Sequence, residues 1–152
     1  MKKLRWGLFA LMALTAAGLG VWTLARAHSK DDWPVPDAAK KVKNPVPVTP
    51  EGLAAARQLY SAKCSRCHGD AGKGDGEEAG MYDPKPADLT DAHMMQAMTD
   101  GEIFYKISEG HDPMPAFKEK IPPEDRWRLV NYARTFSAAQ KPAGAPPAPP
   151  SH

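Results

Sequence analysis

The two cysteines of this 152-residue chain lie in one pentapeptide, Cys64-Ser65-Arg66-Cys67-His68. Two thiols at this spacing can form thioethers with the two vinyl groups of a haem, while the adjacent imidazole reaches the iron. The pentapeptide therefore predicts one covalently attached haem c. Cys64 and Cys67 would hold the porphyrin, and His68 would bind the iron as its proximal ligand.

Three other interpretations of the cysteine pair are less favoured. A structural zinc site needs four protein ligands, and no second Cys or His pair stands at the usual spacing. A thioredoxin-like redox pair would follow a strand, whereas residues 53–63 are predicted to be helical. A structural disulfide that closes so short a loop would gain little entropy. Haem attachment is therefore the favoured interpretation.

The prolines divide the chain into regions. Most of the 16 prolines lie within residues 34–50 and 142–150, so the compact part is expected at residues 49–137. That length suits one small domain. These residues include 11 Lys or Arg and 15 Asp or Glu, a net charge of −4. A nucleic-acid-binding domain would present a basic face, so nucleic acid is not an expected partner.

Residues 1–27 are predicted to be a signal peptide or an N-terminal membrane anchor. Basic residues precede an uncharged, mostly apolar run over residues 6–25. Positive charges keep this end in the cytoplasm, so the rest of the chain is expected on the periplasmic side of the cytoplasmic membrane. The run is long enough to cross a ~30 Å hydrocarbon core as a helix, but Ala25-Arg26-Ala27 resembles a cleavage site. Two alternatives therefore stay open: the segment is retained and anchors the domain, or it is cleaved and the domain is soluble.

Pro-rich stretches flank the domain on both sides. Residues 28–48 are predicted to be a linker with extended, polyproline-like backbone. Such a linker would tether an anchored domain as it moves between partners, or serve as a plain spacer. Residues 138–152 are rich in Pro and Ala without periodicity, and they are predicted to be disordered.

Capping residues and apolar stripes predict the helices of the domain. Thr49 and Thr90 are each expected to cap a helix, and Thr99 forms a capping box with Glu102. The last helix is expected after a pair of prolines and carries an apolar stripe. Residues 69–80, rich in glycine and acidic residues, are expected to form a surface loop. The predicted helices cover residues 50–63, 91–98, 100–109 and 123–136.

The segment Leu59-Tyr60-x-x-x-Cys64-x-x-Cys67-His68-Gly69 resembles the first helix and the haem loop of class I cytochromes c. The resemblance covers residues 49–136. It implies an all-α class I cytochrome c fold of about four to five helices around one covalently bound haem, here with extended Pro-rich tails. It also implies that Ala56 and Tyr60 on the first helix pack against Tyr132 on the last helix.

The distal ligand of the iron is predicted to be Met114, in the segment His111-Asp112-Pro113-Met114-Pro115-Ala116-Phe117. A thioether ligand must be held at the iron against dissociation, and the prolines on both sides of Met114 restrict the backbone that carries it. Met-Pro-Ala-Phe also resembles the axial-methionine loop of the family. His111 and His93 are alternative ligands, and an open distal position is a third possibility.

The resemblance implies further residues around the haem. In the family, a proline carbonyl accepts the N–H of the proximal imidazole and so fixes its orientation. Pro84 and Pro86 are both candidates for this role. An apolar envelope around the haem is expected from five side chains, namely Tyr60, Ile103, Phe104, Trp127 and Tyr132.

A haem with histidine on one side and methionine on the other has no vacant position for a substrate. The leading hypothesis is therefore a monohaem electron carrier, not an enzyme, that passes single electrons between a donor and an acceptor protein. The acidic domain predicts partners with basic docking sites. Two alternatives stay open: a haem enzyme or ligand sensor with an open or weak distal position, and an anchored cytochrome subunit of a membrane respiratory complex.

Overall fold

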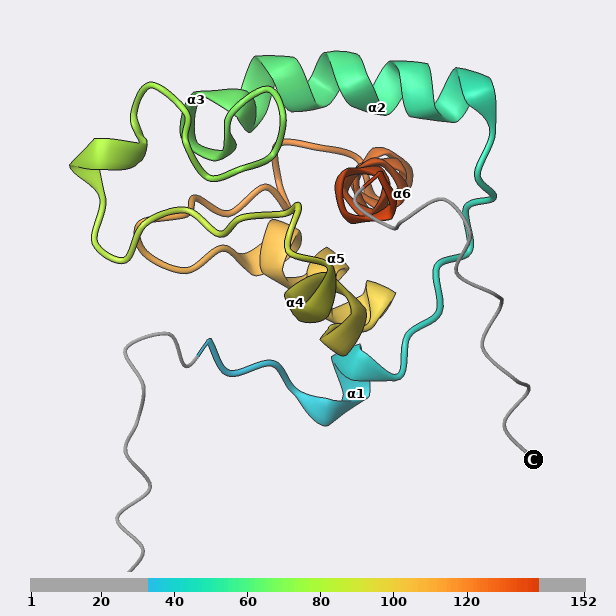
Figure 1. Ribbon diagram of the computed structural model, residues 1–152. Helices are drawn as coiled ribbons and strands as arrows, with labels where there is room; N and C mark the ends of the chain where they lie inside the picture. The colour runs from blue at the N-terminus through green and yellow to red at the C-terminus, as the bar shows by residue number, and fades with distance from the viewer. Residues whose placement is uncertain (1–32, 140–152) are drawn as a thin grey trace, which may run out of the picture.

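The computed structural model describes residues 33–139 of the chain. The expected export segment and almost all of the predicted tail lie outside this range. The described residues form helices and include no strand, which confirms the predicted all-α fold. The elements are α1 (Asp37–Lys40), α2 (Pro50–Lys63), α3 (Ser65–His68), η1 (Ala79–Met81), α4 (Ala92–Ala97), α5 (Asp100–Glu109) and α6 (Pro123–Ala138) (Figure 1).

The predicted caps of α2 and α5 are confirmed. At the start of α2, the Gly52 N–H donates to Thr49 Oγ1 at 3.0 Å. At the start of α5, the Thr99 N–H donates to Glu102 Oε2 at 2.7 Å, and the Glu102 N–H donates to Thr99 Oγ1 at 3.2 Å. Each cap satisfies backbone donors that have no partner within the helix, so residues close in sequence determine where these helices begin.

The predicted cap of α4 is wrong by one residue. The Asp91 carboxylate, rather than Thr90, accepts the N–H groups of His93 and Met94, at 2.9 and 3.0 Å. The Thr90 side chain donates to Asp88 Oδ1 at 2.6 Å instead. A carboxylate at the N-cap also lies at the positive end of the helix dipole, which favours Asp91 over the neutral hydroxyl.

Helices α2 and α6 form the frame of the fold. In Figure 1, α2 lies across the view while α6 is seen end on beneath it, so the two helices cross steeply. Tyr60 of α2 is buried between Tyr132 and Phe136 of α6, at ring-centroid distances of 5.4 and 5.1 Å. The expected contact between Tyr60 and Tyr132 is therefore confirmed, and Ala56 is also buried in α2.

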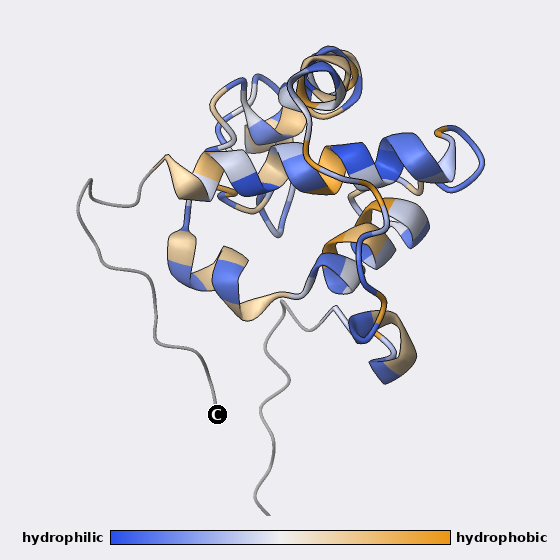
Figure 2. Cartoon of the chain, turned by 90° about the vertical axis from the view of Figure 1, so that its right-hand side faces the viewer, coloured by the Kyte–Doolittle hydropathy of each residue, from blue (hydrophilic) through white to orange (hydrophobic). Residues whose placement is uncertain are grey.

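Two hydrophobic clusters of buried residues lie on the two sides of α6. We call the first the Met95 cluster; it consists of Met95, Ile103, Trp127, Val130 and Ala133. We call the second the Tyr60 cluster; it consists of Tyr60, Phe117, Ile121 and Leu129. Because α6 contributes to both clusters, it joins α4 and α5 to α2. Figure 2 shows hydrophobic and hydrophilic residues alternating along α6, as expected for a helix that packs on several neighbours.

Residues 33–48, which we call the N-terminal strap, pack against the helical domain. The Asn44 amide donates to Asn131 Oδ1 of α6 at 2.8 Å, and the Asn131 amide donates to the Val46 carbonyl at 3.1 Å. Figure 1 shows the strap passing beneath α5 and then rising towards α2. The prediction of a linker over residues 28–48 therefore needs correction for its described part, because this part is docked on the domain.

Helix α1 of the strap lies directly on α5 at Gly101. A Cβ atom at Gly101 would lie 2.1 Å from the Ala39 carbonyl oxygen and 2.8 Å from that of Val42. Only glycine allows such a close approach of the two backbones. None of the helices between Trp33 and Ala139 is long and apolar enough to cross a membrane.

We expect Met95→Ala to destabilise the domain by about 2–5 kcal/mol, because Met95 is 1% exposed at the centre of its cluster and the substitution leaves a cavity. Met81→Ala is the control. Since Met81 is 68% exposed, its replacement should change the free energy of unfolding by no more than about 0.5 kcal/mol. Denaturant unfolding of the haem-loaded protein measures both. Equal effects of the two substitutions would contradict the core assignment.

Candidate haem-binding site

The cysteine pentapeptide forms the junction of α2 and α3. The Cys64 N–H donates to the Tyr60 carbonyl at 2.8 Å and so ends α2, while the His68 N–H donates to the Cys64 carbonyl at 2.9 Å within the next turn. The chain thus continues from a long helix into a single turn of a second helix. This turn brings Cys64, Cys67 and His68 to one end of α2.

The two thiols are free and half-buried. Burial raises the pKa of the Cys64 thiol to about 12, and the neighbouring Cys67 adds to the shift. Redox-active cysteine pairs instead depend on a lowered thiol pKa, which makes the reactive thiolate available. The environment of Cys64 therefore argues against a thioredoxin-like pair. Neither cysteine is in a disulfide, so both sulfurs are available for thioethers.

The imidazole of His68 is held by a backbone carbonyl. Its Nδ1 lies 3.1 Å from the Ala87 carbonyl oxygen. Because a carbonyl can only accept, Nδ1 is the donor, and Nε2 remains free to bind a metal. Burial lowers the pKa of His68, and the bond to Ala87 partly opposes this shift. The neutral imidazole is the form that binds iron.

The expected role of Pro84 or Pro86 as this acceptor is corrected by the structure. The acceptor is Ala87, the residue that follows Pro86. The Pro86 carbonyl oxygen faces Gly74 instead, since a Cβ atom at Gly74 would lie 2.3 Å from it. The packing of the glycine-rich loop therefore decides which carbonyl meets the imidazole.

The glycine-rich loop, residues 69–80, has a role that the sequence prediction missed. Its N–H groups donate to the carbonyls of α3: Gly74 to His68 at 2.9 Å, Gly76 to Cys67 at 3.1 Å and Glu78 to Arg66 at 2.9 Å. These carbonyls end a helix and have no partner within it. The loop therefore wraps the pentapeptide and fixes its last turn. The run of glycines directly after the pentapeptide is the sequence feature that could have predicted this close packing.

Met114 lies in a tight turn directly after α5. The His111 N–H donates to the Met114 carbonyl at 2.9 Å, and the Met114 N–H donates to the His111 carbonyl at 2.6 Å. The Met114 side chain is half-buried and packs against the Tyr60 cluster. Cys64 packs against the same cluster. The fold therefore brings the predicted distal ligand and one predicted thioether sulfur to the same group of buried side chains.

Neither of the two alternative distal ligands is buried, although His111 belongs to the same turn as Met114. His93 is exposed on α4, and His111 is exposed with its ring 5.3 Å from that of Trp33. The predicted envelope is divided between the two clusters: Tyr60 and Tyr132 lie in or beside the Tyr60 cluster, while three residues lie in or beside the Met95 cluster, namely Ile103, Phe104 and Trp127. The buried Ile121 in the Tyr60 cluster was not predicted, because one apolar residue before two prolines gives no periodic signal.

These residues suit a covalently attached haem. Two free thiols stand at the required spacing, the imidazole keeps Nε2 free, and a thioether packs on the same cluster as Cys64. Cys64 and Cys67 would hold the porphyrin, and His68 would bind the iron. The bound iron would supply one-electron oxidation and reduction.

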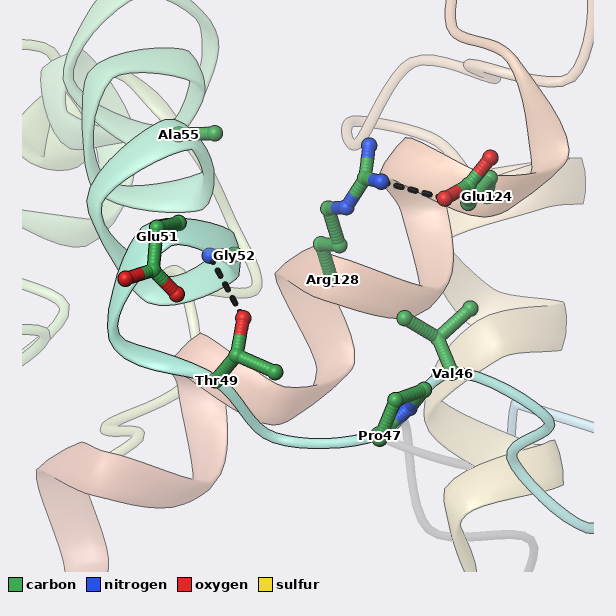
Figure 3. A pocket seen from close by; sticks show the side chains of 8 residues that line it. All are labelled: Val46, Pro47, Thr49, Glu51, Gly52, Ala55, Glu124 and Arg128. Atoms are coloured by element: carbon green, nitrogen blue, oxygen red, sulfur yellow. Dashed lines mark hydrogen bonds and ion pairs between the residues drawn. The ribbon is translucent and has the colours of Figure 1, made fainter.

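A groove of about 400 Å³ lies apart from these residues, at the opposite end of α2. Figure 3 shows it between the start of α2, with Thr49 and Glu51, and the start of α6, where Arg128 pairs with Glu124. None of its lining residues belongs to the cysteine pentapeptide or to the Met114 turn. The groove is therefore separate from the candidate haem site.

The comparison with known protein families agrees with a haem site. Residues 51–132, more than half of the chain, match the family model described as "Cytochrome C oxidase, cbb3-type, subunit III". Among solved structures, the KustC0563 c-type cytochrome is 33% identical, with a TM-score of 0.47, over 53% of this chain and 95% of that chain. The Kuenenia stuttgartiensis reducing HAO-like protein complex Kustc0457/Kustc0458 is 25% identical, with a TM-score of 0.52, over 62% of this chain and 49% of that chain. No curated protein matches the chain significantly.

We expect Gly76→Ala to impair the site, because the new Cβ atom would lie 2.3 Å from the Arg66 carbonyl oxygen within the pentapeptide. The backbone must shift, at a cost of about 1–3 kcal/mol. Gly80→Ala is the matched control, since nothing lies within 4 Å of its Cβ position. The free energy of unfolding and the yield of covalent haem per polypeptide should both fall for Gly76→Ala alone. Normal values for Gly76→Ala would contradict the tight wrapping described above.

Proposed function

The chain belongs to the c-type cytochrome family whose model it matches, and from this we propose that it is a monohaem carrier that passes single electrons between two redox proteins. As a member of the family, it binds haem c covalently and transfers electrons. The proposal adds the ligands: His68 would bind the iron on one side and Met114 on the other. With both positions taken, the protein would be a carrier rather than an enzyme.

The observation that best supports this ligand pair is the packing of Met114. The turn folds back after α5 so that the Met114 side chain and Cys64 pack against one buried cluster. Prolines on both sides restrict the backbone of Met114. His93 and His111, the alternatives, are exposed. Of the three candidates, Met114 is the one that is partly buried, and it packs against the cluster that Cys64 also contacts.

The residues of the site would tune the reduction potential. A methionine ligand raises it, and exclusion of water from the porphyrin raises it further. Tyr60, Phe117, Ile121 and Leu129 are all buried, at 7% exposure or less. The hydrogen bond from His68 Nδ1 to Ala87 would keep the imidazole in one tautomer and one orientation.

The segment that follows the pentapeptide, residues 69–91, is acidic and would guide docking. Residues 69–91 hold seven carboxylates, namely Asp70, Asp75, Glu77, Glu78, Asp83, Asp88 and Asp91, and only two lysines, Lys73 and Lys85. Arg66 neutralises part of this charge through ion pairs with Glu77 and Glu78. In Figure 1 the loop lies on the same side of the molecule as α3. A basic partner site would complement it, with the small, salt-sensitive contact that suits a shuttle.

The proposed location is the periplasmic side of the cytoplasmic membrane. It rests on the basic residues that precede the apolar run of residues 6–25. This segment would either anchor the domain or be removed after export.

A second candidate function is that of a cytochrome subunit within a larger respiratory complex. The description of the matched family, which names subunit III of a cytochrome c oxidase, favours it. Co-purification of the full chain with an integral membrane oxidoreductase would support this function over a free carrier. A haem enzyme or ligand sensor would instead turn over peroxide or bind carbon monoxide readily at neutral pH.

We expect Met114→Ala to remove the weak red charge-transfer band that reports methionine ligation in the ferric protein. The reduction potential should fall, because the methionine no longer favours the reduced iron. Met94→Ala is the matched control, since Met94 is also partly buried but packs against the Met95 cluster. Absorption spectra of the oxidised and reduced protein measure the outcome. A wild-type protein with a high-spin spectrum and no such band would contradict Met114 ligation and favour the enzyme or sensor.

We expect the double substitution Asp70→Asn and Asp83→Asn to slow reduction of the ferric protein by hexaammineruthenium(II), a cation, several-fold at low ionic strength. Reduction by ascorbate, an anion, should not slow. The effect should vanish in high salt, because the Debye length shrinks from ~30 Å at 0.01 M to ~3 Å at 1 M. Glu51→Gln, at the far end of α2, is the control. A rate that is indifferent to salt would rule out electrostatic docking at this loop.

A further inference from the structure

Trp33, the first residue of the N-terminal strap, packs against the turn that carries Met114. The ring of Trp33 lies 5.3 Å from the ring of His111, with an angle of 31° between their planes. The ammonium of Lys106 lies 5.2 Å from the centroid of the Trp33 ring, a cation–π distance. Trp33 is therefore held between a residue of α5 and the first residue of the Met114 turn.

His111 is tied to Met114 through the backbone. The two residues exchange hydrogen bonds in both directions, at 2.9 and 2.6 Å. They close a turn whose outer residues, His111 and Asp112, are exposed. A contact that restrains the His111 ring therefore restrains the backbone that carries the Met114 thioether.

The strap that delivers Trp33 is fixed at two further points. Asn44 donates to Asn131 and thereby joins the strap to α6. Gly101 allows α1 to lie directly on α5, with the Ala39 carbonyl against it. Trp33 thus reaches the turn from a docked segment, so the contact between Trp33 and His111 needs little additional ordering of the chain.

We propose that Trp33 is a positioning residue for Met114. By packing on His111 it holds the turn closed and slows the departure of the Met114 thioether from the iron. This role rests on the proposed function, because it requires Met114 to be the distal ligand. The strap would then be part of the electron-transfer site, in addition to linking the domain to the predicted signal peptide or anchor.

The size of the effect follows from the contact. The interaction energy of such an aromatic pair, if it is lost before the methionine leaves, corresponds to about a two- to tenfold change in the rate constant of methionine departure. Loss of the Trp33 ring should therefore speed methionine departure by that factor without abolishing ligation. Trp33→Phe keeps an aromatic ring and should remain within about twofold of the wild type.

The test uses the full-length, haem-loaded ferric protein and imidazole as the probe. Imidazole binds only after the methionine leaves, so the rate at saturating imidazole in stopped-flow absorption measures methionine departure. We expect this rate to rise in Trp33→Ala and to be restored in Trp33→Phe. Val48→Ser is the control, because Val48 is on the same strap and 66% exposed. Its rate should equal that of the wild type.

A double-substitution cycle separates positioning from general destabilisation. His111→Ala should speed methionine departure about as much as Trp33→Ala, and the double variant should be no faster than the faster single variant. Additive effects would overturn the proposal, as would a Trp33→Ala protein that keeps the charge-transfer band and the wild-type rate. Those outcomes would contradict the role of Trp33 but not the assignment of Met114 as the distal ligand. A wild-type protein without the band, and without a saturating rate, would overturn both the ligand pair and the role of Trp33.

Discussion

The packing of Tyr60 determines where the haem motif lies. Its ring is buried against Tyr132 and Phe136 of α6, and its hydroxyl donates to the Gly69 carbonyl at 2.8 Å. Burial raises the pKa of Tyr60, so the hydroxyl remains a donor. Because Gly69 follows His68 directly, the crossing of α2 and α6 fixes the end of the pentapeptide. The fold and the site are therefore stabilised by one side chain.

The parts of the structure that could be predicted from sequence depend on residues close together. Thr49, and Thr99 with Glu102, cap helices through bonds to groups three residues away. The spacing of Cys64, Cys67 and His68 is likewise a property of five consecutive residues. Such signals are local, so neither a core nor a partner segment is needed to interpret them.

The parts that could not be predicted depend on residues far apart. His68 and Ala87 are separated by 19 positions, and every residue of the intervening loop offers a carbonyl of the same kind. Asn44 and Asn131 are separated by 87 positions. The prolines around Asn44 favour extended backbone whether the segment is docked on α6 or free, so they do not predict this contact. Only the packing of the glycine-rich loop and of α6 distinguishes these alternatives.

The Met114 turn differs from the loops that close over substrates. Those loops belong to the least stable parts of proteins, because they must open. Here both ends of the loop are held. Gly110 adopts a φ of +65° that reverses the chain, and the Phe117 N–H donates to the Ile107 and Ser108 carbonyls at 3.2 and 3.1 Å. A loop restrained at its base, and by Trp33 at the first residue of its turn, suits a ligand that must stay in place while electrons pass. Restraint at both places is what the proposed carrier, with Met114 as a lasting ligand, would require.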